Sequence, residues 1–146
     1  MRRLHRFLRL TPADRQLLVE AALNLAAIRL ALGLFSFQTV LNLLTRMRGL
    51  RSRSVQGPQS SRIIWAVESA SRHVPGTNTC LIRALAAHTL LNERSRPARL
   101  QIGVAKGPDG KLQAHAWVES DGKVLIGGAA DLDNFRPLSA GGVTGL

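Results

Sequence analysis

PGTNTCLIRALAAHTLLN, residues 75–92, is the stretch that decides the fold. The Pro-Gly pair at its beginning predicts a turn, and either Asn78 or Thr79 can cap the helix that follows. Apolar residues then recur at helical spacing, so we expect this helix to continue to about Asn92. Cys80 falls in its first turn, where backbone N–H groups have no partner within the helix.

The apolar period changes from helical to two after Pro97. Residues 99–104 and 111–119 alternate on either side of a Pro-Asp-Gly turn, and an Asp-Gly turn leads to a third segment, residues 123–126. We therefore expect a three-stranded antiparallel meander after the helix. The last segment, from residue 127, is rich in Gly, Ala and Pro, and only three of its residues are suited to anchor it: Phe135, Pro137 and Leu138.

A long helix is expected on the N-terminal side. Thr11-Pro12-Ala13-Asp14 is a good helix start, because Thr11 can accept hydrogen bonds from free backbone donors and Asp14 suits the positive end of the helix dipole. Helical spacing of apolar residues continues to about Leu32. The apolar stretch from Leu30 to Leu44 is shorter than the roughly 20 residues that span a bilayer and contains polar residues. We favour a helical hairpin, bent near residues 33–36, over a spanning segment.

The region between this hairpin and the Cys80 helix contains the predicted boundary between two parts of the chain. Residues 49–61 are rich in Arg, Ser, Gly and Pro and have no apolar period, which is typical of a linker. A short helix is expected from residue 62 to about residue 72. The chain thus divides into a basic N-terminal helical region, residues 1–53, and a core, residues 60–146. The fold class is α+β, with a Cys-bearing helix packed on a small antiparallel sheet.

The charge of the chain is unevenly distributed. The formal net charge is +11, and residues 1–53 hold ten basic but only two acidic side chains. Such a region attracts anionic partners, which include acidic peptides, nucleic acids and membrane surfaces. Tyr is absent and aromatic residues amount to 4%, so few rings are present on which bases could stack. We expect no nucleic-acid partner, although a basic binding module for nucleic acid or anionic lipid is an alternative to an enzyme.

The chain contains one cysteine, which excludes an intramolecular disulfide and a zinc site made from Cys pairs. A reducing, cytoplasmic location is expected, with contact to a membrane surface as a further possibility. The basic N-terminus lacks the apolar core of a signal peptide, so we interpret it as part of the mature protein. No cofactor and no metal are expected.

Cys80 and His115 are the candidate chemical residues. A helix start stabilises a thiolate, and its N–H groups can hold an oxyanion, although a lone Cys is more often a small buried residue. In the strand, His115, Trp117 and Glu119 share one face, and Ala114, Ala116 and Val118 share the other, which should pack inward. If the Cys80 helix lies across the His115 face, thiol and imidazole can meet. A structural histidine is the alternative reading, and His73 and His88 are weaker candidates.

These blocks resemble a known family. The segments from Pro75 to Ala84, LQIGV (100–104) and AHAWVE (114–119), together with the Thr11-Pro12 helix start, are similar to the transglutaminase-like leader peptidases of lasso-peptide biosynthesis. The resemblance implies a papain-like or transglutaminase-like cysteine peptidase core at residues 60–146. It implies removal of the leader peptide from a ribosomally made precursor. The implied partners are the precursor, a separate leader-binding protein and an ATP-dependent cyclase.

The resemblance also assigns roles to residues. The nucleophile of the family falls on Cys80 and its base on His115. An acid follows the His by about a dozen positions in relatives, and the ungapped place here is Gly127. Asp131, after a small shift, is the substitute, because a strand face or a tight turn already accounts for Glu119 and Asp121. An amide-forming acyltransferase of transglutaminase type is a near alternative to a peptidase.

Overall fold

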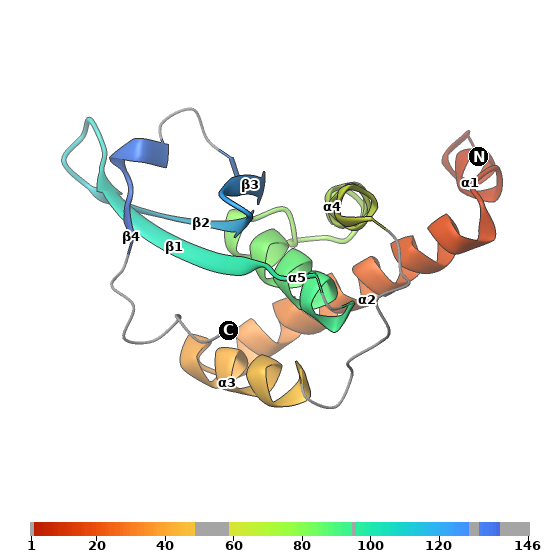
Figure 1. Ribbon diagram of the computed structural model, residues 1–146, viewed down its shortest axis with the longest axis horizontal. Coiled ribbons are helices and arrows are strands. Elements are labelled where there is room, and N and C mark those ends of the chain that lie inside the picture. Colours follow the sequence, from red (N-terminus) through yellow and green to blue (C-terminus); the bar gives the residue numbers. More distant parts are fainter. Residues whose placement is uncertain (1, 49–58, 95, 129–131, 138–146) are drawn as a thin grey trace.

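The computed structural model describes residues 2–48, 59–94, 96–128 and 132–137 (Figure 1). Its helices are α1 (Arg2–Leu8), α2 (Pro12–Leu34), α3 (Phe37–Arg48), α4 (Ser60–Ser71) and α5 (Cys80–Glu93). Its strands are β1 (Arg99–Lys106), β2 (Leu112–Ser120), β3 (Lys123–Ile126) and β4 (Arg136–Pro137), with a 3-10 turn at Leu132–Asn134 before β4. The α+β class is therefore confirmed, and the described part of the chain forms a helical layer and one small sheet.

The N-terminal helical hairpin forms where the sequence predicts it. The Thr11 side chain accepts a hydrogen bond from the Asp14 backbone N–H at 3.2 Å, and α2 begins at Pro12. The helix ends at Leu34, and α3 begins at Phe37 and turns back beneath the end of α2 (Figure 1). The predicted bend near residues 33–36 is thus confirmed.

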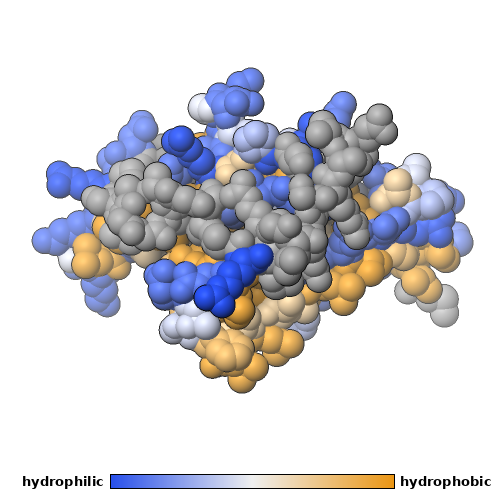
Figure 2. All heavy atoms as spheres, turned by 60° about the horizontal axis from the view of Figure 1, so that its bottom comes forward, coloured by the Kyte–Doolittle hydropathy of each residue, from blue (hydrophilic) through white to orange (hydrophobic). Residues whose placement is uncertain are grey.

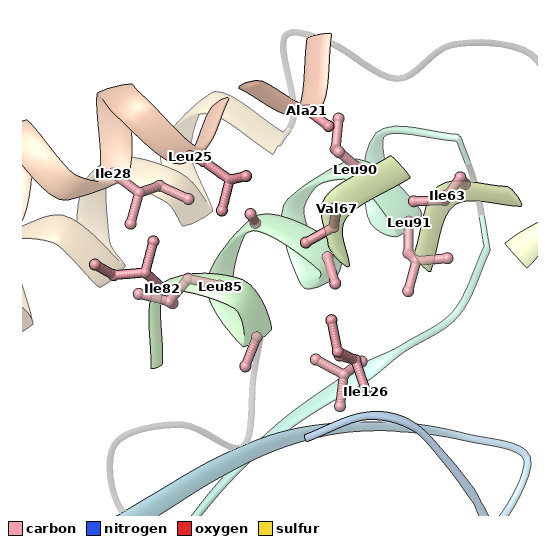
Figure 3. Packing of buried hydrophobic residues seen from close by; sticks show 14 of the residues in the cluster. Ala21, Leu25, Ile28, Ile63, Val67, Ile82, Leu85, Leu90, Leu91 and Ile126 are labelled. Atoms are coloured by element: carbon pink, nitrogen blue, oxygen red, sulfur yellow. The ribbon is translucent and has the colours of Figure 1, made fainter. Parts of the chain in front are cut away.

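Helices α2, α4 and α5 pack around a shared apolar core (Figure 3). All three helices contribute side chains that are almost fully buried, including Leu25, Val67 and Leu85. The buried face of α2 is the predicted one, with Leu17, Ala21, Leu25 and Ile28. Helix α2 therefore belongs to the same core as the Cys80 helix. The linker predicted at residues 49–61 lies mostly outside the described residues, and α4 begins two residues earlier than expected, at Ser60.

The sheet has the strand order β3-β2-β1-β4, and all its pairings are antiparallel. The three predicted strands are present. The short β4, in which Pro137 pairs with Gly103 of β1, was not predicted, because a strand of two residues is too short to show an alternation of apolar and polar residues. Helix α5 packs on β2, and Ala116, Val118 and Ile126 face the core from the sheet.

One expectation about β2 was wrong. Ala114 was expected to pack inward with Ala116 and Val118, but it is exposed. Trp117, on the other face, is buried. The helical layer covers only the second half of β2, whereas the beginning of the strand extends beyond the buried core.

Candidate active site

Cys80 is the first residue of α5. The Thr79 side chain caps the helix by accepting a hydrogen bond from the Ile82 backbone N–H at 3.3 Å, as one of the two predicted caps. The thiol is free and partly exposed. A helix start of this kind places partial positive charge and unpaired N–H donors beside the sulfur, which can stabilise a developing oxyanion.

His115 lies on β2 in a shell of aromatic rings and backbone. Its Nε2 atom is 2.5 Å from the carbonyl oxygen of Gly127. The Trp117 ring is stacked near the imidazole with a centroid distance of 6.1 Å, and the Phe135 ring is tilted toward the imidazole with a centroid distance of 5.5 Å. The imidazole is therefore held in one orientation by a hydrogen bond and by two rings.

Glu119 and Gly103 support this aromatic cluster. The indole N–H of Trp117 donates to a Glu119 carboxylate oxygen at 2.7 Å, which fixes the indole plane. Gly103 is the partner of His115 across the β1–β2 pair. A Cβ atom on Gly103 would lie 2.9 Å from the Trp117 ring and 3.0 Å from the Cβ of Phe135, so only glycine leaves room for both rings.

The sheet separates the imidazole from the main body of α5. His115 shares its face with Trp117, whereas α5 packs with Ala116 and Val118 on the opposite face. Among the residues that the structure describes, no hydrogen bond joins the Cys80 sulfur to the His115 ring. The expectation that α5 lies across the His115 face is therefore not met. The β1–β2 hairpin, however, extends past the N-terminal end of α5, which is the end that carries the thiol (Figure 1).

Residues 22–140 match the family model of the transglutaminase-like superfamily. The chain belongs to the transglutaminase-like superfamily. This superfamily includes cysteine proteases and acyltransferases, and the matched region begins within α2 and extends past β4. No curated protein and no solved structure matches the chain significantly.

The third catalytic residue that the family resemblance implies is the point at which this chain departs from the expected pattern. Asp131, the predicted acid, lies outside the described residues. The carbonyl oxygen of Gly127, at the ungapped position of the acid, contacts the imidazole instead. Gly127 has φ +81°, and a Cβ atom there would lie 2.6 Å from the carbonyl oxygen of Ala116. A carboxylate side chain on residue 127 would therefore not fit this backbone. The sequence pointed to residue 127 as the position of the acid. It could not predict that the main-chain carbonyl there would contact His115, because every residue has such a carbonyl.

Neither of the other two candidate histidines, His73 and His88, is placed as His115 is. The Nδ1 atom of His73 hydrogen-bonds the backbone carbonyl of Ser69 at 2.8 Å, so the ring is turned back on α4. His88 is buried in the middle of α5, two helical turns beyond Cys80. Within the described ranges, no group of three or more His, Cys, Asp or Glu side chains is placed to hold a metal ion.

Proposed function

We propose that this chain is a cysteine peptidase that removes the leader peptide from a ribosomally made lasso-peptide precursor. The observation that carries the proposal is a partly exposed thiol on the first residue of a capped helix, in a chain of the transglutaminase-like superfamily. The resemblance of the Cys80 and His115 segments to lasso leader peptidases supports the substrate class. The cytoplasm is the proposed location, because the precursor is made there.

The proposed chemistry is acyl transfer to water. The Cys80 thiolate attacks the carbonyl carbon of the scissile bond, and backbone N–H groups at the start of α5 stabilise the oxyanion. The His115 imidazolium gives a proton to the leaving amine, which becomes the N-terminus of the core peptide. Water, deprotonated by the same imidazole, then releases the leader from the thioester and restores the thiol.

The Gly127 contact assigns the two nitrogens of His115 different tasks. A carbonyl oxygen only accepts hydrogen bonds, so the Nε2 atom beside it carries the hydrogen, and Nδ1 is the basic atom of the neutral ring. We propose that the backbone of Gly127 orients the imidazole in the way that an acid does in relatives. Asp131 is the proposed alternative for this role. A neutral carbonyl stabilises the imidazolium less than a carboxylate, so we expect a slower enzyme with the same chemistry.

The proposed meeting place of thiol and imidazole is the rim of the sheet. Ala114 is exposed, so the helical layer ends close to His115 along β2. Cys80 is the first residue of α5, and no helical turn precedes it to cover this rim. We propose that the bound peptide lies between the sheet rim and the helix start, and that Nδ1 of His115 faces the sulfur in this complex.

The proposed partners follow from the sequence beside the thiol. Residues 75–82 carry no charged side chain, so this segment has little with which to select a peptide sequence. We propose that a separate leader-binding protein delivers the precursor and that a cyclase acts on the freed core. The test is the rate of precursor cleavage with and without the leader-binding protein. An equal rate in both cases contradicts the delivery role.

Substitution of the two residues tests the peptidase directly. Cys80→Ala, Cys80→Ser and His115→Ala should each abolish leader removal and leave the circular dichroism spectrum and thermal transition close to those of the unmodified chain. His88→Ala is not a suitable control because that ring is buried, whereas His73→Ala removes an exposed ring and should keep activity. Cleavage by His115→Ala at the rate of the unmodified chain would show that His115 is not the base.

Amide formation is the second candidate, because the superfamily includes acyltransferases. The same thioester would then be attacked by an amine instead of water. Mass spectrometry of the products separates the two reactions. A free leader with a C-terminal carboxylate supports hydrolysis, and a leader joined to an amine supports acyl transfer.

A further inference from the structure

Helix α2 has a second apolar face that no other described part of the chain covers. Val19, Leu23, Leu30 and Leu34 are between 48% and 77% exposed. At 100° per residue, these four positions fall within about 60° of the helix circumference, so they form one stripe. Phe35, which directly follows α2, and Leu43 of α3 are exposed as well. We call these six residues the outer stripe.

The opposite side of α2 packs in the core. Leu25 and Ala21 are fully buried against α4 and α5. Helix α2 is long enough and apolar enough to cross a membrane. Spanning would expose this core face to lipid and remove α4 and α5 from their packing partner. If α2 keeps one face packed on its domain, its other apolar face can enter a membrane only from the surface, with the helix lying parallel to the bilayer.

Positive charge lies beside one end of the outer stripe. Helix α1 carries exposed Arg2, Arg3 and Arg6 and leads through Arg9 into α2. The two acidic residues of the first 53, Asp14 and Glu20, are held in ion pairs with Arg62 and Arg94 of the core. They are therefore directed to the domain and not to the arginines of α1. Leu4 and Leu8 of α1 are exposed as well.

Apolar atoms form a band along this side of the molecule. Figure 2 shows hydrophobic atoms along the lower edge, from α3 below the centre to α2 and α1 at the right. Large exposed apolar patches on soluble monomers commonly mark interaction sites. The band and the arginines occur together in the N-terminal helices.

We propose that the outer stripe and the arginines of α1 dock the protein on the surface of an anionic lipid bilayer. Helix α2 would lie in the plane of the interface, with its exposed leucines in the acyl boundary and the α1 guanidinium groups on lipid phosphates. Stable binding to a membrane surface needs an apolar insertion and a basic cluster together, and this face supplies both. A second copy of the chain fits less well, because each copy carries +11 and the two α1 helices would repel one another. The docking does not depend on Cys80.

Vesicle co-sedimentation of the full chain tests the proposal. The chain should sediment with phosphatidylcholine vesicles that contain phosphatidylglycerol, and much less with phosphatidylcholine alone. The triple variant Leu23→Gln, Leu30→Gln, Leu34→Gln should lower the bound fraction by at least about tenfold, because three leucines no longer enter the bilayer. Arg2→Gln, Arg3→Gln, Arg6→Gln should remove the preference for the anionic lipid. Raised salt should weaken binding of the unmodified chain.

Leu112→Gln is the matched control, because Leu112 is 79% exposed but lies on the sheet hairpin. It should bind vesicles as the unmodified chain does, and so should Cys80→Ala. Thermal unfolding of each variant verifies that the exposed substitutions leave the fold intact. Equal binding by the triple leucine variant and the unmodified chain overturns the proposal, as does no binding to anionic vesicles. A dimer in light scattering that the triple variant dissociates would also overturn it, because the outer stripe would then be a self-interface.

Discussion

His115 is held by contacts that only small neighbours permit. Gly103 leaves room for the Trp117 and Phe135 rings beside the imidazole, and Gly127 brings a carbonyl oxygen to Nε2. Neither glycine could bear a side chain without displacing backbone or a ring. The orientation of the proposed base therefore depends on backbone shape at residues 103 and 127 as much as on the histidine itself.

Gly127→Ala tests the orienting role of the carbonyl. The substitution forces a Cβ against the Ala116 carbonyl at a φ of +81°, so the backbone must shift and the hydrogen bond to His115 must lengthen. We expect leader cleavage to fall at least about tenfold, and binding of precursor to change little. Kinetic analysis that separates kcat from KM measures this.

Gly122→Ala is the control for backbone strain. Gly122 also has a positive φ, of +75°, but open space surrounds the position of a Cβ, and it lies in the β2–β3 turn. The positive φ alone should cost this variant about 1 kcal/mol of stability, and the variant should keep its cleavage rate. The ¹⁵N chemical shifts of the His115 ring in the unmodified chain test the hydrogen bond to Gly127 separately, because they show which ring nitrogen carries the hydrogen. A hydrogen on Nδ1 instead of Nε2 in the neutral ring would contradict the assigned tautomer.

The sequence identified Cys80 and His115 because each is marked by local pattern. A capping residue followed by helical periodicity places Cys80 at a helix start, and alternation assigns His115 to a strand face. The partner of His115 could not be predicted, because a main-chain carbonyl is present in every residue and only the turn after β3 selects the one on Gly127. The role of Asp131 stays a prediction.

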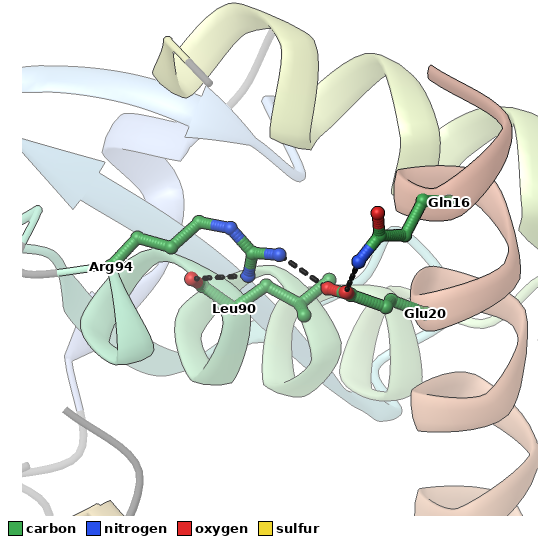
Figure 4. A network of polar contacts seen from close by, with 4 residues as sticks. All are labelled: Gln16, Glu20, Leu90 and Arg94. Atoms are coloured by element: carbon green, nitrogen blue, oxygen red, sulfur yellow. Dashed lines mark hydrogen bonds and ion pairs between the residues drawn. The ribbon is translucent and has the colours of Figure 1, made fainter. Parts of the chain in front are cut away.

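At the scale of elements, two ion pairs fasten α2 to the domain. Arg94, at the end of α5, is buried and pairs with Glu20, which also accepts a hydrogen bond from Gln16 at 3.2 Å (Figure 4). Arg94 donates a second bond to the Leu90 carbonyl at 3.4 Å. At the N-terminal end of α2, Asp14 pairs with Arg62 of α4.

Glu20→Gln should destabilise the fold more than an exposed substitution does. It leaves the Arg94 guanidinium buried without its counter-charge, and we expect the free energy of unfolding to fall by about 2–3 kcal/mol. Urea unfolding followed by circular dichroism measures the loss. The double variant Glu20→Gln, Arg94→Met should recover much of it, because the uncompensated charge is then absent. A single variant as stable as the unmodified chain would show that the pair is not formed in solution.

The Asp14 pair should make stability depend on pH at the acid end. The hydrogen bond from Arg62 holds the pKa of Asp14 below its ordinary value. A carboxyl with a lowered pKa stabilises the fold at pH values above its unfolded pKa, and this contribution is lost as the pH falls through the lowered value. The stability difference between the unmodified chain and Asp14→Asn should therefore be largest near neutral pH and shrink toward about pH 3. A difference that grows on acidification would contradict the pairing.

Local patterns predicted the long helices and the three strands of the meander within a few residues. They did not predict β4, whose two residues are held only by pairing with β1. They also did not predict that Trp117 would be buried on the face of the sheet away from α5, because alternation indicates two faces but not what covers each. Phe135, recognised as an anchor, lies beside the His115 ring on that face.

At the scale of the whole molecule, the N-terminal helices and the sheet are two sides of one unit. The superfamily match begins within α2, and α2 shares its core with α5, so the helical region helps to hold the helix that carries the thiol. The outer stripe of α2 is exposed, while the hairpin of β1 and β2 extends in another direction (Figure 1). We therefore propose that docking and chemistry use different sides of the molecule.

Intact-mass analysis of a rapidly quenched reaction tests whether Cys80 is the nucleophile. When the chain is mixed with a lasso precursor and its leader-binding protein, we expect an adduct with the mass of the leader, bound as a thioester to Cys80, followed by free leader and core. Cys80→Ala should give neither adduct nor products. Normal release of the core peptide by a clean preparation of Cys80→Ala would exclude Cys80 as the nucleophile and contradict the proposed mechanism.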